Sequence, residues 1–350
     1  MFDPSRSGAD GLWPEEGLER LGICPVCASP GRQPLYVDAR DLIFKVAPGR
    51  WTVWRCDGCC SGYIDPRPTA ETIELAYRSY YTHGESAAQA PPTLWEQARR
   101  RVANAYANRR YGSKFAATLP GGSLIARLWP PLMAAMDLEN RYLPPGPAGR
   151  RVLDIGCGRG DWLLRARALR WEVAGADPDP VAVAACSAAR IPARSGGVEA
   201  WADEAGSFDA VTMNHSIEHT HNPVAVIRAV ASLLKPGGHF FIETPNIDAL
   251  GRDVYGPNWI GLDVPRHLVI FNRRSLTRAL SDAGFVAIKQ RRRASFFAIT
   301  EMCSARIAAG HYFLDASAPR SQRAPWLVRL HAYFTADRAE VLTLSCKRPI

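Results

Sequence analysis

The sequence predicts a doubly wound α/β fold in which a glycine-rich loop joins the first parallel strand to the first helix. Residues 152–160 read VLDIGCGRG, an apolar strand end followed by glycine at every second position. An apolar run that ends in an acid recurs at 171–177, and further strand patterns follow at 208–213 and 233–242. Helical segments separate these runs, which is the alternation expected of a parallel sheet.

The loop after the first strand can hold a ligand against its backbone. Gly156, Gly158 and Gly160 have no Cβ, so a ligand can lie against backbone amides at the positive end of the following helix. The spacing is G-x-G-x-G, whereas a dinucleotide fingerprint is G-x-G-x-x-G. Asp154 suits a ligand that carries an amine, and Asp177, at the end of the second strand, suits ribose hydroxyls.

These motifs resemble those of the class I S-adenosylmethionine (SAM) dependent methyltransferases. The family pattern is a D-x-G-x-G-x-G loop, an acid after strand two, an F-D-x-V strand and an L-K-P-G-G turn, and 151–244 carries all four in that order. The resemblance implies a seven-strand Rossmann-like sheet and SAM as cofactor. An NAD-binding domain is the competing interpretation. The implied cofactor-binding residues are Asp154, Gly156, Cys157, Gly158, Gly160, Asp177, Asn214 and Glu218.

The bulk composition is that of a globular protein long enough for two domains. Of the 350 residues, 47% are hydrophobic and 22% are charged. The sequence begins without a basic region followed by an apolar stretch, and it has no apolar run of about 18 residues, so we expect a cytoplasmic protein with no transmembrane segment. The net charge of +9 would suit nucleic acid or an acidic substrate, but solvated arginines are the commoner explanation.

Two C-x-x-C pairs predict a zinc site near the beginning of the chain. The candidate ligands are Cys24, Cys27, Cys56 and Cys59. Four thiolates from two tight turns form the tetrahedral set of a structural site and leave zinc no open position for catalysis. Metal binding would supply much of the folding free energy of so small a unit. Disulfides or free thiols are the alternative, which the expected cytosolic setting disfavours.

Two residues depart from the usual zinc-ribbon pattern. Ala28 and Cys60 stand where glycine usually follows the second cysteine of each pair, and Cys60 could replace Cys59 as a ligand. The alternating apolar residues at 35–37 and 51–55 nevertheless predict the short strands that a ribbon requires.

We expect three regions along the chain: a zinc-ribbon-like domain at 1–84, a helical connecting or cap region at 85–147, and a methyltransferase domain at 148–350. The four-cysteine segment, the D-P-R-P stretch at 65–68 and the paired tyrosines at 80–81 resemble a bacterial group of methyltransferases of uncharacterised substrate, often found with polysaccharide or secondary-metabolite enzymes. Helices are predicted at 70–79 and 95–111, with a linker at 85–92.

An apolar patch at 124–133 is too short and too broken by proline to span a membrane. We interpret it as packing against the catalytic domain, with a membrane-surface segment or an active-site lid as alternatives. Helices at 275–283, 295–309 and 325–334 and strands at 286–289 and 340–345 complete the expected fold, the last strand being antiparallel as the resemblance implies.

The segment after the fourth strand, 214–223, reads NHSIEHTHNP and should face the transferred methyl group, because ligands bind beyond the carboxyl ends of parallel strands. Residues 243–246 should touch the same pocket. An acceptor hydroxyl must lose a proton, and His215, His219 and His267 are the candidate catalytic bases. Each imidazole could equally satisfy a backbone group. A catalytic metal is disfavoured because the segment is not H-E-x-x-H.

An insert at 258–268 follows the fifth strand. The resemblance implies that Trp259, Arg266 and His267 belong to the acceptor side. Arg266 could pair with an acidic acceptor through its planar guanidinium, or it could pin the insert to the core.

The sequence therefore predicts a SAM-dependent methyltransferase that acts on a small-molecule, glycan or secondary-metabolite acceptor, with oxygen as the favoured atom. The alternative is an RNA methyltransferase whose ribbon and basic surface hold the phosphate backbone. Against it, MNHS after strand four is not the N-P-P-Y type, and the ribbon has no cluster of basic and exposed aromatic residues. A SAM-binding protein without activity is disfavoured by the intact loop and acids. No oligomeric state is predicted.

Overall fold

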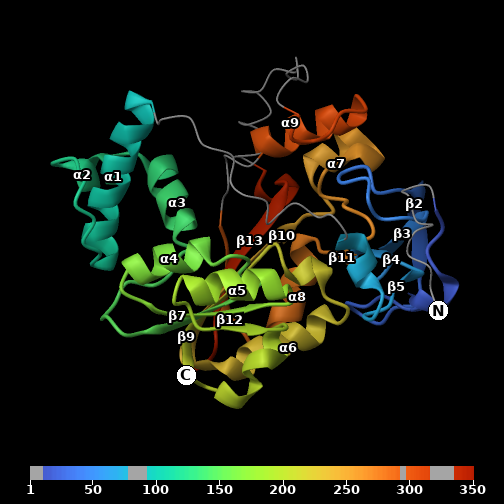
Figure 1. Ribbon diagram of the computed structural model, residues 1–350, viewed down its shortest axis with the longest axis horizontal. Helices are drawn as coiled ribbons and strands as arrows, with labels where there is room; N and C mark the ends of the chain where they lie inside the picture. Colours follow the sequence, from blue (N-terminus) through green and yellow to red (C-terminus); the bar gives the residue numbers. More distant parts are fainter. Residues whose placement is uncertain (1–10, 78–92, 292–296, 316–334) are drawn as a thin grey trace.

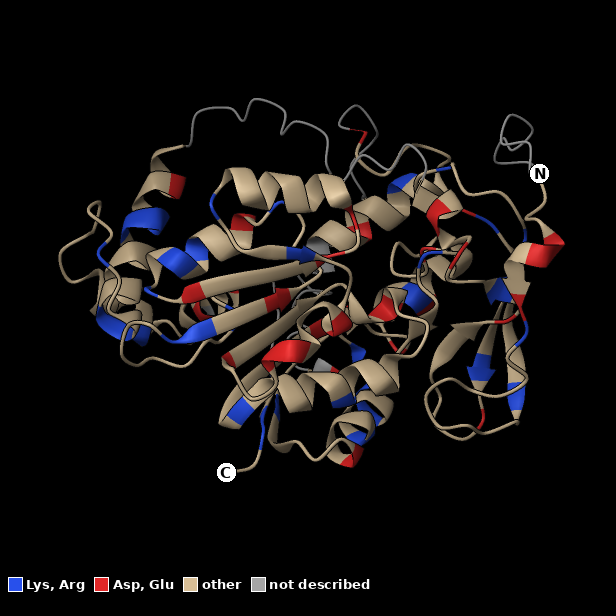
Figure 2. Ribbon diagram, turned by 60° about the horizontal axis from the view of Figure 1, so that its bottom comes forward, with Lys and Arg blue, Asp and Glu red and all other residues tan. Residues whose placement is uncertain are grey.

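The computed structural model describes residues 11–77, 93–291, 297–315 and 335–350 (Figure 1). A seven-stranded sheet forms the centre of residues 151–350, and Figure 2 shows it between two layers of helices. The strand order is β12-β13-β10-β9-β6-β7-β8. The strands are β6 (Arg151–Ile155), β7 (Glu172–Asp177), β8 (Ala193–Ser195), β9 (Phe208–Asn214), β10 (Leu234–Pro245), β12 (Val286–Gln290) and β13 (Val341–Lys347).

The sheet has the topology that the sequence predicted. Strands β10, β9, β6, β7 and β8 are parallel, and β13 runs antiparallel to both of its neighbours. The central strands are apolar on both faces, as Val152, Leu153 and Val211 show by their complete burial. Such runs are typical of parallel strands covered by helices on both sides.

The helices over the sheet begin at recognisable capping residues. Asp179 and Asn222 accept hydrogen bonds from backbone amides of α5 and α6, each of which has proline in its first turn. Asn272 and Ser275 form a reciprocal capping box at α8. These helices are α4 (Asp161–Ala168), α5 (Pro180–Ala188), α6 (Pro223–Leu233), α7 (Leu250–Tyr255), α8 (Arg273–Asp282) and α9 (Phe297–Ala308).

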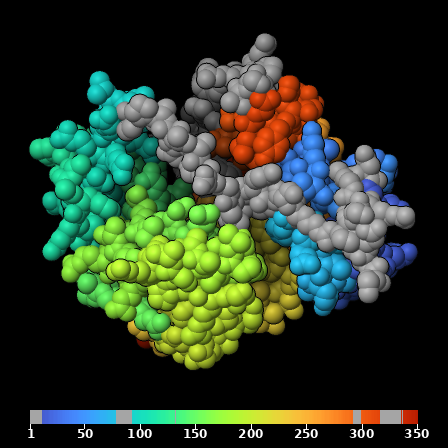
Figure 3. Space-filling view, viewed as in Figure 1, coloured from blue at the N-terminus to red at the C-terminus, as the bar shows by residue number. Residues whose placement is uncertain are grey.

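A separate helical region, α1 (Leu94–Tyr111), α2 (Gly122–Leu128) and α3 (Pro130–Glu139), precedes β6. It stands at the edge of the molecule opposite the beginning of the chain (Figures 1 and 3). Short 3₁₀ turns occur at Glu15–Gly17, Ile73–Tyr77, Val198–Glu204, Ile217–His219, Gly256–Asn258 and Ala336–Arg338. Among the described helices, none combines the length and the apolar character needed to cross a bilayer.

Several predicted elements differ from the structure. The helix expected at 70–79 is only the 3₁₀ turn Ile73–Tyr77, and its last two residues lie outside the described residues. The turn expected within 233–242 is a register shift inside β10, at which Gly237 adopts a φ of 73°. The short strand β8 was not predicted, since three residues give no periodic pattern. The helix predicted at 325–334 and the linker at 85–92 lie outside the described residues.

The N-terminal region shares a sheet with a strand that follows β10. Strands β2 (Arg32–Ala39), β3 (Trp51–Cys56) and β4 (Gly62–Ile64) are extended by β11 (Val269–Ile270), which directly follows the insert at 258–268. In this antiparallel pairing Tyr63 lies opposite Val269. A small second pair joins β1 (Leu18–Glu19) to β5 (Arg67–Pro68). The ribbon is therefore joined to the insert by backbone hydrogen bonds.

A buried arginine makes the second connection between these regions. Arg266 is completely buried; its Nε donates to Asp263 Oδ1 at 2.8 Å and its Nη1 donates to Asp41 Oδ2 at 3.1 Å and to Ala76 O at 2.8 Å. Although burial favours the neutral acid, Arg266 holds the pKa of Asp41 below its usual value. Of the two roles left open for Arg266, the structure shows that it pins the insert to the N-terminal region.

Removing this arginine should destabilise the protein strongly. Because Arg266→Ala leaves two carboxylates buried beside each other, we expect a loss of about 3–5 kcal/mol in the free energy of unfolding. The matched control is Arg273→Ala, which removes an exposed ion pair with Asp337 and should cost about 1 kcal/mol or less. Urea denaturation followed by circular dichroism measures both. Equal losses in the two variants would contradict the assignment.

Candidate functional site

The glycine loop between β6 and α4 lies against the end of β7. The amides of Gly156 and Cys157 donate to Ala176 O at 2.8 Å and 3.1 Å. Gly156, Gly158 and Gly160 have φ values of 77°, 53° and 84°. A Cβ on Gly156 would lie 2.6 Å from Ser216 Cβ, whereas a Cβ on Gly158 would meet nothing within 4 Å. The loop therefore needs Gly156 for close packing, and at Gly158 it leaves its backbone open to a ligand.

Asp177 lies at the end of β7, directly beside the open part of the loop. Its Oδ2 accepts from the amide of Gly158 at 2.8 Å and its Oδ1 accepts from the amide of Asp179 at 3.0 Å. Cys157 faces the opposite way, with its Sγ 3.9 Å from Cys186 Sγ, and burial raises the pKa of its thiol. Asp177 is thus the charged group at this end of the loop, and Cys157 contributes packing and its backbone.

Asp154 is buried at the end of β6 and is paired with a residue that the sequence analysis did not single out. It accepts a hydrogen bond from Thr212 Oγ1 at 2.8 Å and forms an ion pair with Arg141. The guanidinium of Arg141 also lies 3.9 Å from the centre of the Trp162 ring. Burial raises the pKa of Asp154, and Arg141 opposes this effect. Arg141 belongs to no local sequence motif. It reaches the strand ends only because the turn after α3 brings it there in the folded chain.

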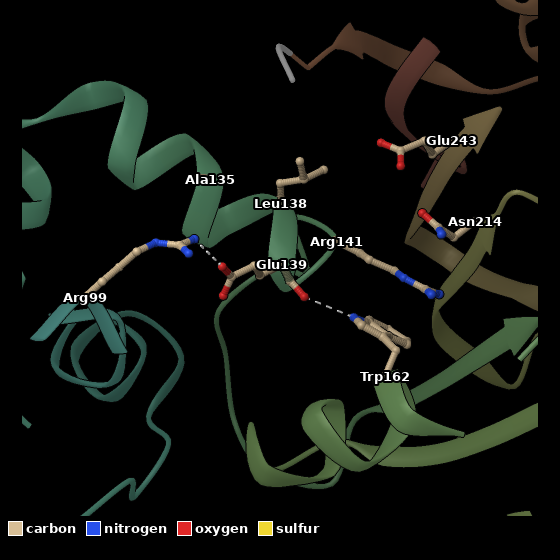
Figure 4. Close-up of a pocket in the computed structure, with 8 residues that line it drawn as sticks. All are labelled: Arg99, Ala135, Leu138, Glu139, Arg141, Trp162, Asn214 and Glu243. Carbon is tan, nitrogen blue, oxygen red and sulfur yellow. Dashed lines mark hydrogen bonds and ion pairs between the residues drawn. The ribbon is translucent and has the colours of Figure 1, made fainter. Parts of the chain in front are cut away.

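A pocket opens between the helical region and the carboxyl ends of the central strands (Figure 4). The helical wall includes Glu139, whose carboxylate accepts from Arg99 at 2.9 Å and whose backbone oxygen accepts from Trp162 Nε1 at 3.3 Å. The strand-end wall comes from β9 and β10. The lining residues are Arg99, Ala135, Leu138, Glu139, Arg141, Trp162, Asn214 and Glu243.

His215 lies next to this pocket, between two buried carboxylates. Its Nδ1 is 3.3 Å from Glu218 Oε1 and its Nε2 is 3.6 Å from Glu243 Oε1, while its side chain remains 32% exposed. Glu218 also accepts from Thr244 Oγ1 at 3.0 Å. Burial alone would raise the pKa of Glu218, but the interaction with His215 lowers this pKa to about 2. The side chain of His215 is therefore partly exposed and flanked by two carboxylates, while its Nε2 atom is itself buried.

His219 and His267 are held differently, by backbone carbonyls. The Nδ1 atom of His219 lies 3.0 Å from Arg266 O, and that of His267 lies 2.9 Å from Gly261 O. Because a carbonyl oxygen only accepts, we assign the proton of each neutral ring to Nδ1. Burial, and then the neighbouring His267, lower the pKa of His219 to about 4. Tyr77 of the N-terminal region places its hydroxyl 3.1 Å from His219 Nδ1.

The three predicted bases thus come together, but in different settings. The rings of His219 and His267 are 4.8 Å apart, and both belong to the anchoring of the insert. Donor atoms of Glu218, His219 and His267 all lie within 4.8 Å of one another, so this group could hold a metal ion. Sequence reasoning missed Tyr77, since nothing in the pattern links the end of the ribbon region to the segment after β9.

The two predicted acceptor-side residues Trp259 and Arg266 are buried inside protein contacts. The Nε1 atom of Trp259 donates to Glu340 Oε2 at 2.7 Å, and the side chain is 1% exposed. Arg266 is enclosed by the carboxylates described above. Neither side chain lines the pocket beside Asn214 and Glu243, and both order the insert that carries His267.

The four predicted zinc ligands gather in one cluster. Cys24 Sγ lies 3.6 Å from Cys59 Sγ, and Cys27 Sγ lies 3.4 Å from Cys56 Sγ. All four sulfurs lie within 4.8 Å of one another, as a tetrahedral site with metal–sulfur bonds of about 2.3 Å requires. The fifth cysteine of this region, Cys60, is not part of the cluster.

The two ribbon positions that lack the usual glycine still adopt the backbone conformation typical of glycine. Ala28 and Cys60 adopt φ values of 59° and 62°, the left-handed conformation that glycine adopts most readily. The amide of Val26 points at Cys24 Sγ at 3.5 Å, and the amide of Cys59 points at Cys56 Sγ at 3.4 Å. The two knuckles therefore keep the conformation of the usual motif without its glycines.

Comparisons with known proteins show what the central part of the chain is similar to. Residues 132–290 match the family model described as a methyltransferase domain. The ubiquinone biosynthesis O-methyltransferase of Xanthomonas axonopodis pv. citri (strain 306) is 42% identical over 150 residues, covering 39% of this chain and 62% of the relative. The enzyme of the same name from Marinobacter nauticus is 42% identical over 109 residues, covering 28% of this chain and 45% of the relative. The chain thus spans about half to three fifths of these relatives.

Solved structures with a similar chain path include a SAM-dependent methyltransferase from Archaeoglobus fulgidus, at 19% identity and a TM-score of 0.43, covering 64% of this chain and 98% of that one. A SAM-dependent methyltransferase from Mesorhizobium loti matches at 18% identity and a TM-score of 0.40, covering 61% and 98%. The family match confirms that the chain carries a methyltransferase domain, as the motifs of its central region predicted.

Proposed function

We propose that this chain uses its methyltransferase domain to transfer a methyl group from SAM to an oxygen atom of a small-molecule acceptor. The observation that carries the proposal is one juxtaposition at the ends of the parallel strands. There Asp177 lies beside the open part of the glycine loop, Asp154 pairs with the pocket residue Arg141, and the partly exposed His215 lies next to the pocket residue Asn214. The O-methyltransferase names of the curated relatives support oxygen as the acceptor atom.

The residues around the loop fit the chemical groups of SAM. Asp177 offers carboxylate oxygens for ribose hydroxyls next to the open backbone at Gly158. Asp154 and Arg141 present opposite charges at the other end of the loop, which suits the ammonium and carboxylate groups of an amino acid. When bound, SAM supplies a methyl group activated by its sulfonium. The chain then contributes orientation, which is worth several kcal/mol in such a displacement.

His215 is the base that the geometry favours. Its side chain is partly exposed beside the pocket residues Asn214 and Glu243, and its two flanking carboxylates would stabilise the imidazolium that forms when it takes a proton. His219 and His267 direct their Nδ1 protons to backbone carbonyls and serve to order the insert. We therefore assign deprotonation of the acceptor hydroxyl to His215 and its orientation to Glu218 and Glu243.

We also propose that the N-terminal cysteines hold one structural zinc ion. The four sulfurs are already close enough to share a metal, and the backbone amides of Val26 and Cys59 support two of them. Because β4 of the ribbon pairs with β11, which directly follows the insert, zinc would also order the strand next to His267. The ion would act on the acceptor side of the site through structure alone.

Calorimetric titration with S-adenosylhomocysteine tests the cofactor assignment. The unmodified protein should bind this ligand and not NAD. Asp177→Ala removes the hydrogen bonds proposed for ribose and should weaken binding about ten- to hundredfold, because hydrogen bonds to charged groups contribute about 1.5–3 kcal/mol. The control is Asp203→Ala, an exposed acid paired with Arg194, which should bind normally. Binding of NAD, or unchanged affinity in Asp177→Ala, would refute the assignment.

Methylation assays with labelled SAM and a panel of small hydroxylated acceptors test the base. His215→Asn suits the local φ of 53° and should lower kcat about 10²- to 10⁴-fold, while S-adenosylhomocysteine affinity stays within about threefold. His239→Gln, at a buried histidine of β10, is the control and should retain most of the activity. If His215→Asn kept its kcat, the base would have to be another group.

Metal analysis of two neighbouring cysteine variants tests the zinc site. The purified protein should contain about one zinc per chain. Cys59→Ser should lose the metal and unfold more readily, whereas Cys60→Ser should keep both metal content and stability, because Cys60 lies outside the cluster. The reverse result would make Cys60 the ligand. Absence of metal from the unmodified protein would argue against the site.

A further inference from the structure

The segment 124–133, interpreted from the sequence as core packing, divides into a buried part and an exposed part. Ala126, Leu132 and Met133 contribute to the core between α1 and β6. Leu124, Ile125, Leu128 and Trp129 point away from it and are 61%, 44%, 77% and 63% exposed. The spacing i, i+1 and i+4 places Leu124, Ile125 and Leu128 on one side of α2, and Trp129 follows directly after the last residue of that helix. We call this set the α2 face.

The helical region around the α2 face has more basic than acidic residues. Between 93 and 139 the sequence has seven Lys or Arg residues and three acids, in a chain whose net charge is +9. Two of the basic residues, Arg99 and Arg110, are paired with Glu139 and Asp137. All seven basic residues are exposed. Figure 2 shows basic residues gathered at the side of the molecule where α1, α2 and α3 lie. The beginning of α1 adds two further exposed apolar residues, Leu94 and Trp95.

The mixture of apolar and basic side chains indicates which kind of partner could cover the α2 face. Three of the four residues of the α2 face are aliphatic, and neither phosphates nor stacked bases would remove them from water. A bilayer interface accommodates Leu and Trp at the level of the headgroups, while Arg and Lys beside them attract anionic lipids. The density of positive charge also opposes pairing of this face with a second copy of itself.

We infer that the α2 face docks on an anionic membrane surface. Leu128 and Trp129 enter the interface between headgroups and acyl chains, and exposed basic residues such as Arg127 contact acidic lipid headgroups. Helix α3 begins directly after Trp129 and ends at Glu139 in the wall of the pocket. The docked face is thus connected by one short helix to the proposed methyl-transfer site. The inference concerns binding and does not require that the proposed activity be correct.

Co-sedimentation with large unilamellar vesicles tests this inference on the full-length protein. We expect binding to vesicles of equal parts phosphatidylcholine and phosphatidylglycerol, and at least about tenfold weaker binding to phosphatidylcholine alone. Binding should weaken as the salt concentration rises from about 50 mM to about 500 mM, since the lipid charge is screened. The double variant Leu128→Ser/Trp129→Ser should lose at least about tenfold in apparent affinity, and Arg127→Glu should lose several-fold.

The matched control is Val181→Ser, which changes another exposed apolar residue, on α5. It should bind vesicles like the unmodified protein, and circular dichroism should show that all variants are folded. Binding of the double variant equal to that of the control would overturn the inference. So would preferential binding of single-stranded RNA that vesicles do not displace, or a concentration-dependent dimer that Leu128→Ser/Trp129→Ser abolishes. S-adenosylhomocysteine affinity, measured on the same variants, should not change.

Discussion

The buried guanidinium of Arg266 is the constraint on which the insert and its contact with the N-terminal region depend. A charge removed from water is tolerated only when its partners are all in place. Here Asp263 lies three residues away in the insert itself, whereas Asp41 and Ala76 come from the N-terminal region. Meeting that requirement fixes the insert against the N-terminal region. The backbone oxygen of Arg266 then accepts from His219, so a structural ion pair also sets the orientation of an imidazole beside the pocket.

The glycine loop is held in a different way, by the local geometry of parallel strands. The loop after β6 is tied to β7 through Ala176 O, and Asp177 in turn accepts from the amide of Gly158. These contacts join residues close to one another in the motif. A sequence pattern could therefore predict them, because the strand, the loop and the acid form one supersecondary unit whose spacing is nearly independent of the rest of the chain.

The residues that the sequence did not predict are those that tertiary packing brings to the site. Arg141 reaches Asp154 only because α3 ends beside the strand ends, and Tyr77 reaches His219 only because the ribbon shares a sheet with β11. The role of Arg266 was open for a related reason, since an arginine that binds an acidic ligand and one that binds a buried aspartate look alike in sequence. The same holds for Leu132 and Leu128, which are both leucines in an apolar segment, one packed in the core and one exposed.

The two sides of the site are thus supported by separate parts of the chain. The helical region supplies Arg141 and Glu139 to the pocket wall near the glycine loop, and the N-terminal region with its cysteine cluster supports the insert near His219 and His267. His215 lies where the two meet, flanked by Glu218 and Glu243 from the core. Since the helical region also carries the α2 face, contact made there would act on the pocket wall near the glycine loop. Metal bound by the cysteines would act on the insert near His219 and His267.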